Sequence, residues 1–225
     1  MGVGLLFVVG EERDSMGAKI ANKHAVGSRF LVNGEPTDNR LALASKGTLR
    51  VELIAQGKMA HSAYPELGES AIEKLLDALE AVRRVPLPKD DVLGPCTMNI
   101  GTISGGRAPN VIPDLAKAEL MLRIVSDPDP IRRAFKAAVG DRVELNEVLC
   151  ISPVRFVTVD GLPTTTVSFA TDVPVFGKTW GEPLLLGPGT IHVAHTPDER
   201  VPKKELAAAV DLYADVVKKL LAKCE

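Results

Sequence analysis

The pattern of apolar and polar residues near the N-terminus predicts strands that alternate with a helix. The apolar run Leu5–Val9 predicts a buried strand that Gly10 stops. Residues 15–26 have the composition of a helix, and residues 29–32 predict a short strand. A turn-like stretch, Gly34–Thr37, follows. Strand, helix and strand in this order are typical of an α/β unit.

Between residues 46 and 152 the pattern predicts a separate α+β domain. The strand segments alternate apolar and polar residues, and the helix segments carry apolar residues at helical spacing. The order is strand, helix, strand, strand, helix, strand, which is typical of a ferredoxin-like open antiparallel sheet with two helices on one face. In chain order, the predicted elements span residues 48–56, 69–84, 96–104, 116–125, 128–139 and 143–148. The apolar stripe of the first helix is predicted to contain Ile72, Leu75, Leu76, Leu79 and Val82.

The remainder of the chain returns to the α/β pattern. Residues 165–170 fit either a helix or a strand edge, and residues 174–176 predict a strand. Residues 205–222 predict an amphipathic helix. Its buried stripe is predicted to contain Leu206, Val210, Tyr213, Val217 and Leu220. We therefore expect an α/β domain formed by residues 1–45 and 153–225, with residues 46–152 inserted into it.

Composition and charge favour an ordinary globular protein. The chain has 225 residues and a net charge of -2, with acidic and basic residues mixed along it, so neither a nucleic-acid surface nor a membrane-surface helix is indicated. The N-terminal apolar run lacks the basic leader of a signal peptide. The cysteines form no CxxC pair, which favours thiols in a reducing compartment and a cytoplasmic location. They are Cys96, Cys150 and Cys224.

Acidic residues follow the first two predicted strands. Glu11 and Glu12 come directly after Gly10, and ligands of open α/β sheets bind just beyond the carboxyl ends of strands. Adjacent carboxylates need a cation or hydrogen bonds to stay ionised, so one can ligate a metal while the other serves as a general base. A solvated surface pair is the ordinary alternative. Glu35 follows the next strand and would lie on the same edge, or it caps a turn.

Five further positions carry chemically useful side chains. His195 lies in a loop before the last helix, where it is either a metal ligand or a surface histidine, and His192 competes for that role. His61 follows the first strand of the inserted domain. Asn110 fits a turn residue and Arg123 fits an outward-facing charge on a strand. Taken alone, each of these positions has an ordinary structural explanation.

Taken in order, the motifs closely resemble one family over nearly the whole chain. They are GEE, GEPT with a following KG, GxxAHSAYPxxGxSAI, GTIxGGxxxNVIPDxAxxxLxxR and GPGxxxxAHTPDE. This series resembles the di-zinc amidohydrolases, which include acetylornithine deacetylase, succinyl-diaminopimelate desuccinylase, aminoacylase-1 and carboxypeptidase G. The resemblance implies a zinc-peptidase-like catalytic domain with an inserted ferredoxin-like lid that mediates dimerisation.

The resemblance also implies roles in the catalytic domain. Glu11 matches the general base that activates the bridging water. Glu12 and His195 match ligands of one zinc, and Glu35 matches a ligand of the other. A complete site of the family holds two zinc ions, and cobalt is an alternative metal.

Further roles concern the substrate and the partner. His61 matches the lid histidine that reaches into the partner subunit's active site and steadies the oxyanion. Asn110 and Arg123 match lid residues that hold the substrate, including its carboxylate. Gly187 and Gly189 match the loop that lines the pocket. The implied partners are a small N-acyl amino acid or peptide substrate and a second copy of the chain.

The expected activity is hydrolysis of the amide bond of an N-acyl amino acid, as in acetylornithine deacetylase, or of a small peptide. Desuccinylase-like or carboxypeptidase activity is an alternative within the family. A non-catalytic homologue that acts only as a dimerising domain is an alternative of another class. A nucleotide-binding protein has little support, because neither GxGxxG nor GxxxxGK[ST] follows a predicted strand.

The sequence departs from the family pattern before Gly10. The His-x-Asp motif and the aspartate that bridges both metals are expected well upstream of GEE, and this sequence contains neither. A catalytic zinc site usually takes three protein ligands, so Glu12, Glu35 and His195 do not complete two sites. We therefore expect an incomplete catalytic domain, impaired activity, and a partly exposed segment at Leu5–Val9.

Overall fold

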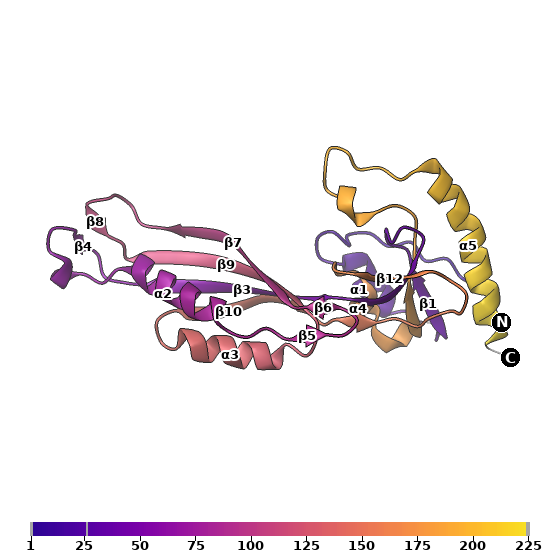
Figure 1. The fold of residues 1–225 in the computed structure, drawn as a ribbon, viewed down its shortest axis with the longest axis horizontal. Coiled ribbons are helices and arrows are strands. Elements are labelled where there is room, and N and C mark those ends of the chain that lie inside the picture. The colour runs from indigo at the N-terminus through magenta and orange to yellow at the C-terminus, as the bar shows by residue number, and fades with distance from the viewer. Residues whose placement is uncertain (1, 26, 224–225) are drawn as a thin grey trace. The chain divides into compact units, whose positions relative to one another are not determined.

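The structure is a computed structural model that describes residues 2–25 and 27–223. The chain divides into two compact units, one formed by the segments up to Ser45 and from Val154 onward, the other by Lys46–Pro153 (Figure 1). None of the helices among the described residues combines the length and hydropathy that a bilayer crossing requires. Cys224, one of the predicted thiols, lies outside the described residues.

The unit Lys46–Pro153 is built on a four-stranded antiparallel sheet. The strand order is β10-β3-β9-β7, which is the order of a ferredoxin-like fold and confirms the predicted topology. Every predicted helix and strand of this unit is present. They are β3 (Gly47–Gln56), α2 (Ala71–Arg83), β7 (Thr97–Gly105), β9 (Leu115–Ile124), α3 (Asp129–Val139) and β10 (Glu144–Ile151).

Alternation along the strands separates the two faces of this sheet. On β3, Leu49, Val51 and Leu53 are buried, whereas Arg50 and Glu52 between them are only half-buried. These two charged residues form ion pairs with the equivalent face of β9, to Glu119 and Lys117 respectively. Helix α2 packs against β3 and β9 and against α3. One face is therefore the core and the other is polar.

Of the five positions in the predicted stripe of α2, three are correct, Ile72 is only half-buried and Leu76 is wrong. Leu75, Leu79 and Val82 are buried, but Leu76 is 48% exposed. Alanines 71 and 78 complete the buried side instead. Small side chains at these positions let the helix lie close to the sheet, and the helix then turns Leu76 to its open side. The helix begins at the capping residue Ser70, whose side chain accepts a hydrogen bond from the Glu73 N–H at 3.2 Å.

Small elements complete this unit. β4 (Ala60–His61) pairs with β8 (Val111–Ile112), beyond the end of the sheet at which Gln56 pairs with Leu115 (Figure 1). A 3₁₀ turn, η1 (Pro65–Leu67), follows β4, and β5 (Lys89–Asp90) pairs with β6 (Gly94–Pro95).

The other unit contains two small sheets. β1 (Phe30–Asn33) runs parallel to β13 (Glu182–Leu185), and β2 (Leu41–Ser45) lies between antiparallel β11 (Val154–Arg155) and parallel β12 (Thr164–Val167). The helices are α1 (Met16–Asn22), α4 (Val173–Phe176) and α5 (Lys203–Ala222), with 3₁₀ turns η2 (Gly177–Trp180) and η3 (Ile191–Val193).

Two apolar clusters hold these elements together. Leu41, Leu184 and Leu186 pack with Val216 and Leu220 of α5. The second cluster contains Ala42, Phe156, Val167, Val173 and Leu185, and it joins β2, β12, α4 and β13. Helix α1 packs against α4.

The predicted strand at Leu5–Val9 is wrong. The segment has no regular secondary structure and pairs with no strand among the described residues. Leu5 is 85% and Phe7 89% exposed, so the expected exposure of this segment is confirmed.

Three other predictions in this unit need correction. Residues 174–176 form part of the single turn α4 and not a strand, since a proline fits the first turn of a helix. α1 ends at Asn22, short of the predicted end at 26. On α5, Leu206 and Val210 are 57% and 69% exposed, because its first turns lack an apolar partner among the described residues. Its buried side consists of Ala209, Val216 and Leu220.

Candidate metal and catalytic site

Two parallel strands bring distant loops to one edge. β1 leads to Glu35 and β13 leads to Gly187, and the Glu35 N–H donates to the Leu186 carbonyl at 3.4 Å. A Cβ at Gly187 would lie 2.5 Å from the Glu35 carbonyl oxygen, so only glycine lets these backbones approach so closely. Because the carboxyl ends of parallel strands lie at the same edge of a sheet, the sequence could predict that the loops of Glu35 and Gly187 are neighbours.

Glu12 and His195 form the closest contact between predicted site residues. The Glu12 Oε1 and His195 Nε2 atoms lie 3.0 Å apart, although 183 positions separate them in sequence. The His195 backbone has φ 61° and its N–H donates to Glu199 Oε2 at 3.0 Å. The hydrogen bond with Glu12, together with the charge of that carboxylate, raises the pKa of His195. The pair joins one oxygen and one nitrogen donor, both kinds that zinc accepts.

Glu11 and Glu35 lie in a region of negative charge. Burial and the charge of Glu12 raise the pKa of Glu11, with a further contribution from Asp172. Burial and the charge of Glu11 raise the pKa of Glu35 to about 7, although a 3.5 Å hydrogen bond from Asn33 opposes this. A bound cation would relieve this repulsion.

Asp172 is a feature of the site that the sequence did not reveal. It is 2% exposed, and neither carboxylate oxygen has a hydrogen-bond partner among the described residues. It acts on Glu11 and Glu35 through its charge. The signal available in the sequence was a single aspartate inside the apolar stretch FATDVPVF, which lies outside the motifs that carry the resemblance to the family.

The described residues do not assemble a complete metal site. No group of three or more His, Cys, Asp or Glu side chains among them is placed to hold one ion. Glu12 and His195 therefore form a two-donor pair, and Glu35 stands apart from it as a third donor. His192 is exposed, and the hydrogen bond that involves it is made by its backbone N–H to Thr190.

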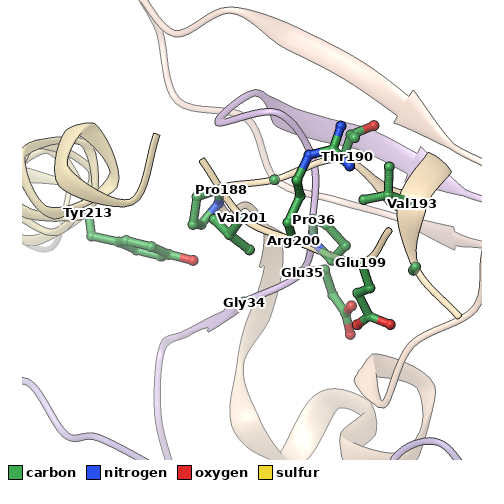
Figure 2. A pocket seen from close by; sticks show the side chains of 12 residues that line it. Gly34, Glu35, Pro36, Pro188, Thr190, Val193, Glu199, Arg200, Val201 and Tyr213 are labelled. Atoms are coloured by element: carbon green, nitrogen blue, oxygen red, sulfur yellow. The ribbon is translucent and has the colours of Figure 1, made fainter. Parts of the chain in front are cut away.

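A cavity adjoins Glu35. It has a volume of about 570 Å³ and lies between the Glu35 loop, the loop of Pro188–Thr190 and Tyr213 (Figure 2). Glu35 and Glu199 both line the cavity, and Tyr213 points in from α5. The Tyr213 hydroxyl donates to the Leu186 carbonyl. Gly189 lines the cavity, whereas Gly187 is buried against the Glu35 backbone.

Comparison with known proteins identifies the family. Residues 43–145 match the peptidase dimerisation domain of the M20 peptidases. An M20 peptidase domain-containing protein of Schizosaccharomyces pombe is 38% identical over 218 residues, which cover 96% of this chain and 54% of the relative. The chain belongs to the M20 peptidase family. A probable carboxypeptidase of Aspergillus terreus is 37% identical over 247 residues, covering 96% of the M20 chain and 57% of the relative.

Solved structures show the same fold. The aminopeptidase PepT of Bacillus cereus matches with a TM-score of 0.71 at 21% identity, over 95% of this M20 chain and 63% of that structure. A tripeptidase of Staphylococcus aureus matches with a TM-score of 0.69 at 20% identity, over 96% of this M20 chain and 63% of that structure. The M20 chain spans about half the length of the curated relatives it matches.

The residues of the M20 chain that are predicted to contact the substrate lie at two ends of the sheet in the unit Lys46–Pro153. His61 pairs with Val111, and the Ser62 N–H donates to the Asn110 carbonyl at 3.0 Å, so His61 and Asn110 are neighbours. Arg123 pairs with Thr48 near the other end, and its Nη1 donates to Thr48 Oγ1 at 2.8 Å. At ~3.4 Å per residue, the length of β9 separates the two groups by roughly 27 Å.

Proposed function

We propose that this M20 chain provides the general base, zinc ligands and dimerising lid of a hydrolase that cleaves the amide bond of N-acyl amino acids or small peptides. The observation that supports it best is the contact of Glu12 with His195 at 3.0 Å, beside Glu11 and in the same acidic region as Glu35. Two relatives are named M20 peptidase domain-containing protein and probable carboxypeptidase, which favours a peptide or acyl-amino-acid substrate.

The residues suit zinc as the metal. Glu12 and His195 would hold one ion and Glu35 would bind a second, with cobalt as an alternative metal. Carboxylate and imidazole donors fit zinc, and the negative charge of this region fits a dication. When bound, zinc polarises the scissile carbonyl and lowers the pKa of a water molecule towards ~7.

Glu11 is the general base in this proposal. It takes a proton from the attacking water and returns it to the leaving amine. Burial and the neighbouring Glu12 raise its pKa, which brings it closer to the pH at which proton transfer in both directions is efficient.

The lid would contribute to catalysis through a dimer. β7 is an edge strand with Ile103 57% exposed, and Leu76 on α2 is 48% exposed, so an apolar edge is open to a second copy. His61 of one copy would then reach the active site of the other and stabilise the oxyanion, and Asn110 would hold the substrate. Arg123, at the opposite end of the sheet, would bind the substrate carboxylate. The free thiols Cys96 and Cys150 favour a reducing compartment, and we infer a cytoplasmic location.

Hydrolysis of N-acetylornithine and of a small set of dipeptides with added zinc tests the proposal. The assay compares the 225-residue chain with a version extended at its N-terminus by a segment that carries the His-x-Asp motif and bridging aspartate of the family. We expect turnover from the extended version, its loss in Glu11→Gln, and little turnover from the chain alone. Equal turnover by Glu11→Gln would refute the assigned base, and no turnover by the extended version would refute the hydrolase.

A second candidate is a dimerising domain without catalytic activity. The match to the dimerisation domain and the lack of a three-donor group among the described residues favour it. A stable dimer with no zinc binding and no turnover in the extended version would support this alternative.

A further inference from the structure

The imidazole of His61 has one ring nitrogen engaged and the other open. The Ala63 backbone N–H donates to Nδ1 of His61 at 3.1 Å. Nε2 makes no hydrogen bond within the part of the chain that the structure describes. A neutral imidazole has one nitrogen that donates and one that accepts, and the hydrogen bond of one nitrogen sets the role of the other. Since Nδ1 accepts from a backbone N–H, the proton of the neutral ring lies on Nε2.

A tight turn places the Ala63 N–H beside the ring. The Tyr64 N–H donates to the His61 carbonyl at 2.9 Å, which closes the turn over Ser62 and Ala63. The Tyr64 ring also contacts the imidazole edge-on, with centroids 6.3 Å apart and an interplanar angle of 60°. His61 is exposed to solvent, so without these two contacts its ring would rotate and exchange tautomers freely.

The backbone that carries this turn is held by the unit Lys46–Pro153. β4 pairs with β8, and the Ser62 N–H donates to the Asn110 carbonyl at 3.0 Å. A Cβ at Gly68 would lie 2.8 Å from the Cβ of Ala60, so the end of η1 lies in close contact with β4. The turn therefore has a fixed support, which a side chain needs if it is to be held in one orientation.

We propose that Ala63 is a positioning residue for His61, because its backbone N–H fixes the ring orientation and the tautomer in which Nε2 carries the proton. His61 then presents a neutral N–H donor, and not a base, to an oxygen atom of the substrate. The inference rests on the proposed hydrolase function, and it assigns the donor atom of the oxyanion contact and the group that orients it. A donor that is oriented before the reaction needs no reorganisation when charge develops on the oxygen.

Nitrogen NMR of the 225-residue chain, labelled with nitrogen-15 at histidine and alanine, tests the assignment. The chain has 4 histidines, so the spectrum of each imidazole can be separated. Spectra at about pH 8, where an ordinary histidine is neutral, show which ring nitrogen carries the proton. We expect the proton of His61 on Nε2 alone. We also expect a scalar coupling, transmitted through the hydrogen bond, between the Ala63 amide nitrogen and Nδ1 of His61.

Two histidines serve as controls within the same spectrum. The imidazoles of His24 and His192 make no hydrogen bond among the described residues, since only their backbone N–H groups are engaged. Both tautomers should therefore be populated at these two positions.

Two substitutions at position 63 separate the backbone N–H from the side chain. Ala63→Pro removes the N–H, so His61 should acquire the tautomer mixture of His24 and His192. Ala63→Gly keeps the N–H and should leave the tautomer of His61 unchanged. The coupling between Ala63 and His61 in the parent chain requires no substitution, so the test holds even where proline disturbs the turn.

The inference would be overturned by a His61 proton on Nδ1, or by a tautomer mixture equal to that of His24 and His192 in the parent chain. Absence of the coupling to Ala63, or an unchanged His61 tautomer in Ala63→Pro, would overturn it as well. None of these results depends on turnover. The hydrolase proposal is judged by turnover of the extended version and its dependence on Glu11, so the failure of one is distinguishable from the failure of the other.

Discussion

The Oε1 atom of Glu12 lies 3.0 Å from Nε2 of His195, across 183 positions of the sequence. Both side chains are largely exposed, 70% for Glu12 and 72% for His195, so the pair contributes little to stability by itself. An exposed pair of an oxygen and a nitrogen donor is suited to exchange its shared proton for a metal ion.

Replacing either member of the pair should weaken zinc binding and leave the fold intact. We expect Glu12→Gln and His195→Asn to reduce zinc affinity at least tenfold, since each removes one donor of the pair. The melting temperature of the metal-free chain should stay unchanged, because the contact is exposed. Calorimetric titration and thermal melts measure the two effects. His192→Asn is the control, and a loss of zinc binding equal to that of His195→Asn would show that the ligand was misassigned.

Zinc binding should strengthen as the pH rises through the pKa of His195. The Glu12 carboxylate raises that pKa, so a proton competes with zinc up to a higher pH than for a free histidine. Titrations at several pH values should show this dependence in the parent and a weaker one in His195→Asn. An identical dependence of zinc affinity on pH in the parent and in His195→Asn would contradict this prediction.

The stability of the metal-free chain should fall as the pH rises towards 7 because of Glu35. The folded state raises its pKa from 4.5 to about 7, so the folded state binds the proton more tightly than the unfolded state. This contribution is fully present below about pH 4.5 and is lost as the pH rises through about 7. At ~1.4 kcal/mol per pKa unit, the rise from 4.5 to about 7 corresponds to about 3.5 kcal/mol, which the partial exposure of Glu35 to solvent reduces to about 2 kcal/mol.

Urea denaturation with a chelator, at several pH values, checks the Glu35 effect. Glu35→Gln should remove most of the slope of the unfolding free energy against pH, because the amide does not titrate. The exposed residue Glu182 provides the control Glu182→Gln, which should keep the slope of the parent. A parent slope that persists in Glu35→Gln would assign the titration to another group.

Charge on the β7 edge should prevent dimerisation. Ile103 is 57% exposed on β7, and Val148 is 50% exposed on the opposite edge strand β10. We expect Ile103→Arg to be monomeric by sedimentation, because a second copy would have to bury the new charge. Val148→Arg should remain dimeric. The reverse result would place the interface on β10, and a monomeric parent would refute the dimer.

Neighbouring leucines on α2 should differ in their effect on stability. Leu75 is 1% exposed and Leu76 is 48% exposed. Leu75→Ala should lower the free energy of unfolding by about 2–5 kcal/mol, because it leaves a cavity. Leu76→Ala should change it by less than about 1 kcal/mol in the monomeric background Ile103→Arg. Equal losses would show that the helix is rotated relative to this description.

The sequence alone determined the elements whose signal is local. Alternation in residues 48–56 and 116–125 and helical spacing in 69–84 predicted strands and a helix that the structure confirms. These patterns report a period of two or 3.6 residues, which the backbone geometry fixes without knowledge of the partner. The order of the motifs, through its resemblance to one family, likewise led to Glu11, Glu12, Glu35 and His195 as expected site residues.

Only the tertiary structure decided what depends on distant partners. Leu5–Val9 has the composition of a strand but no neighbour to pair with among the described residues, and Leu76 and Val210 have helical spacing but face outward. Asp172 has no local signal, because its significance comes from burial near Glu11 and Glu35, far away in sequence. Burial, pairing and electrostatic environment are relations between segments, and a pattern within one segment does not contain them.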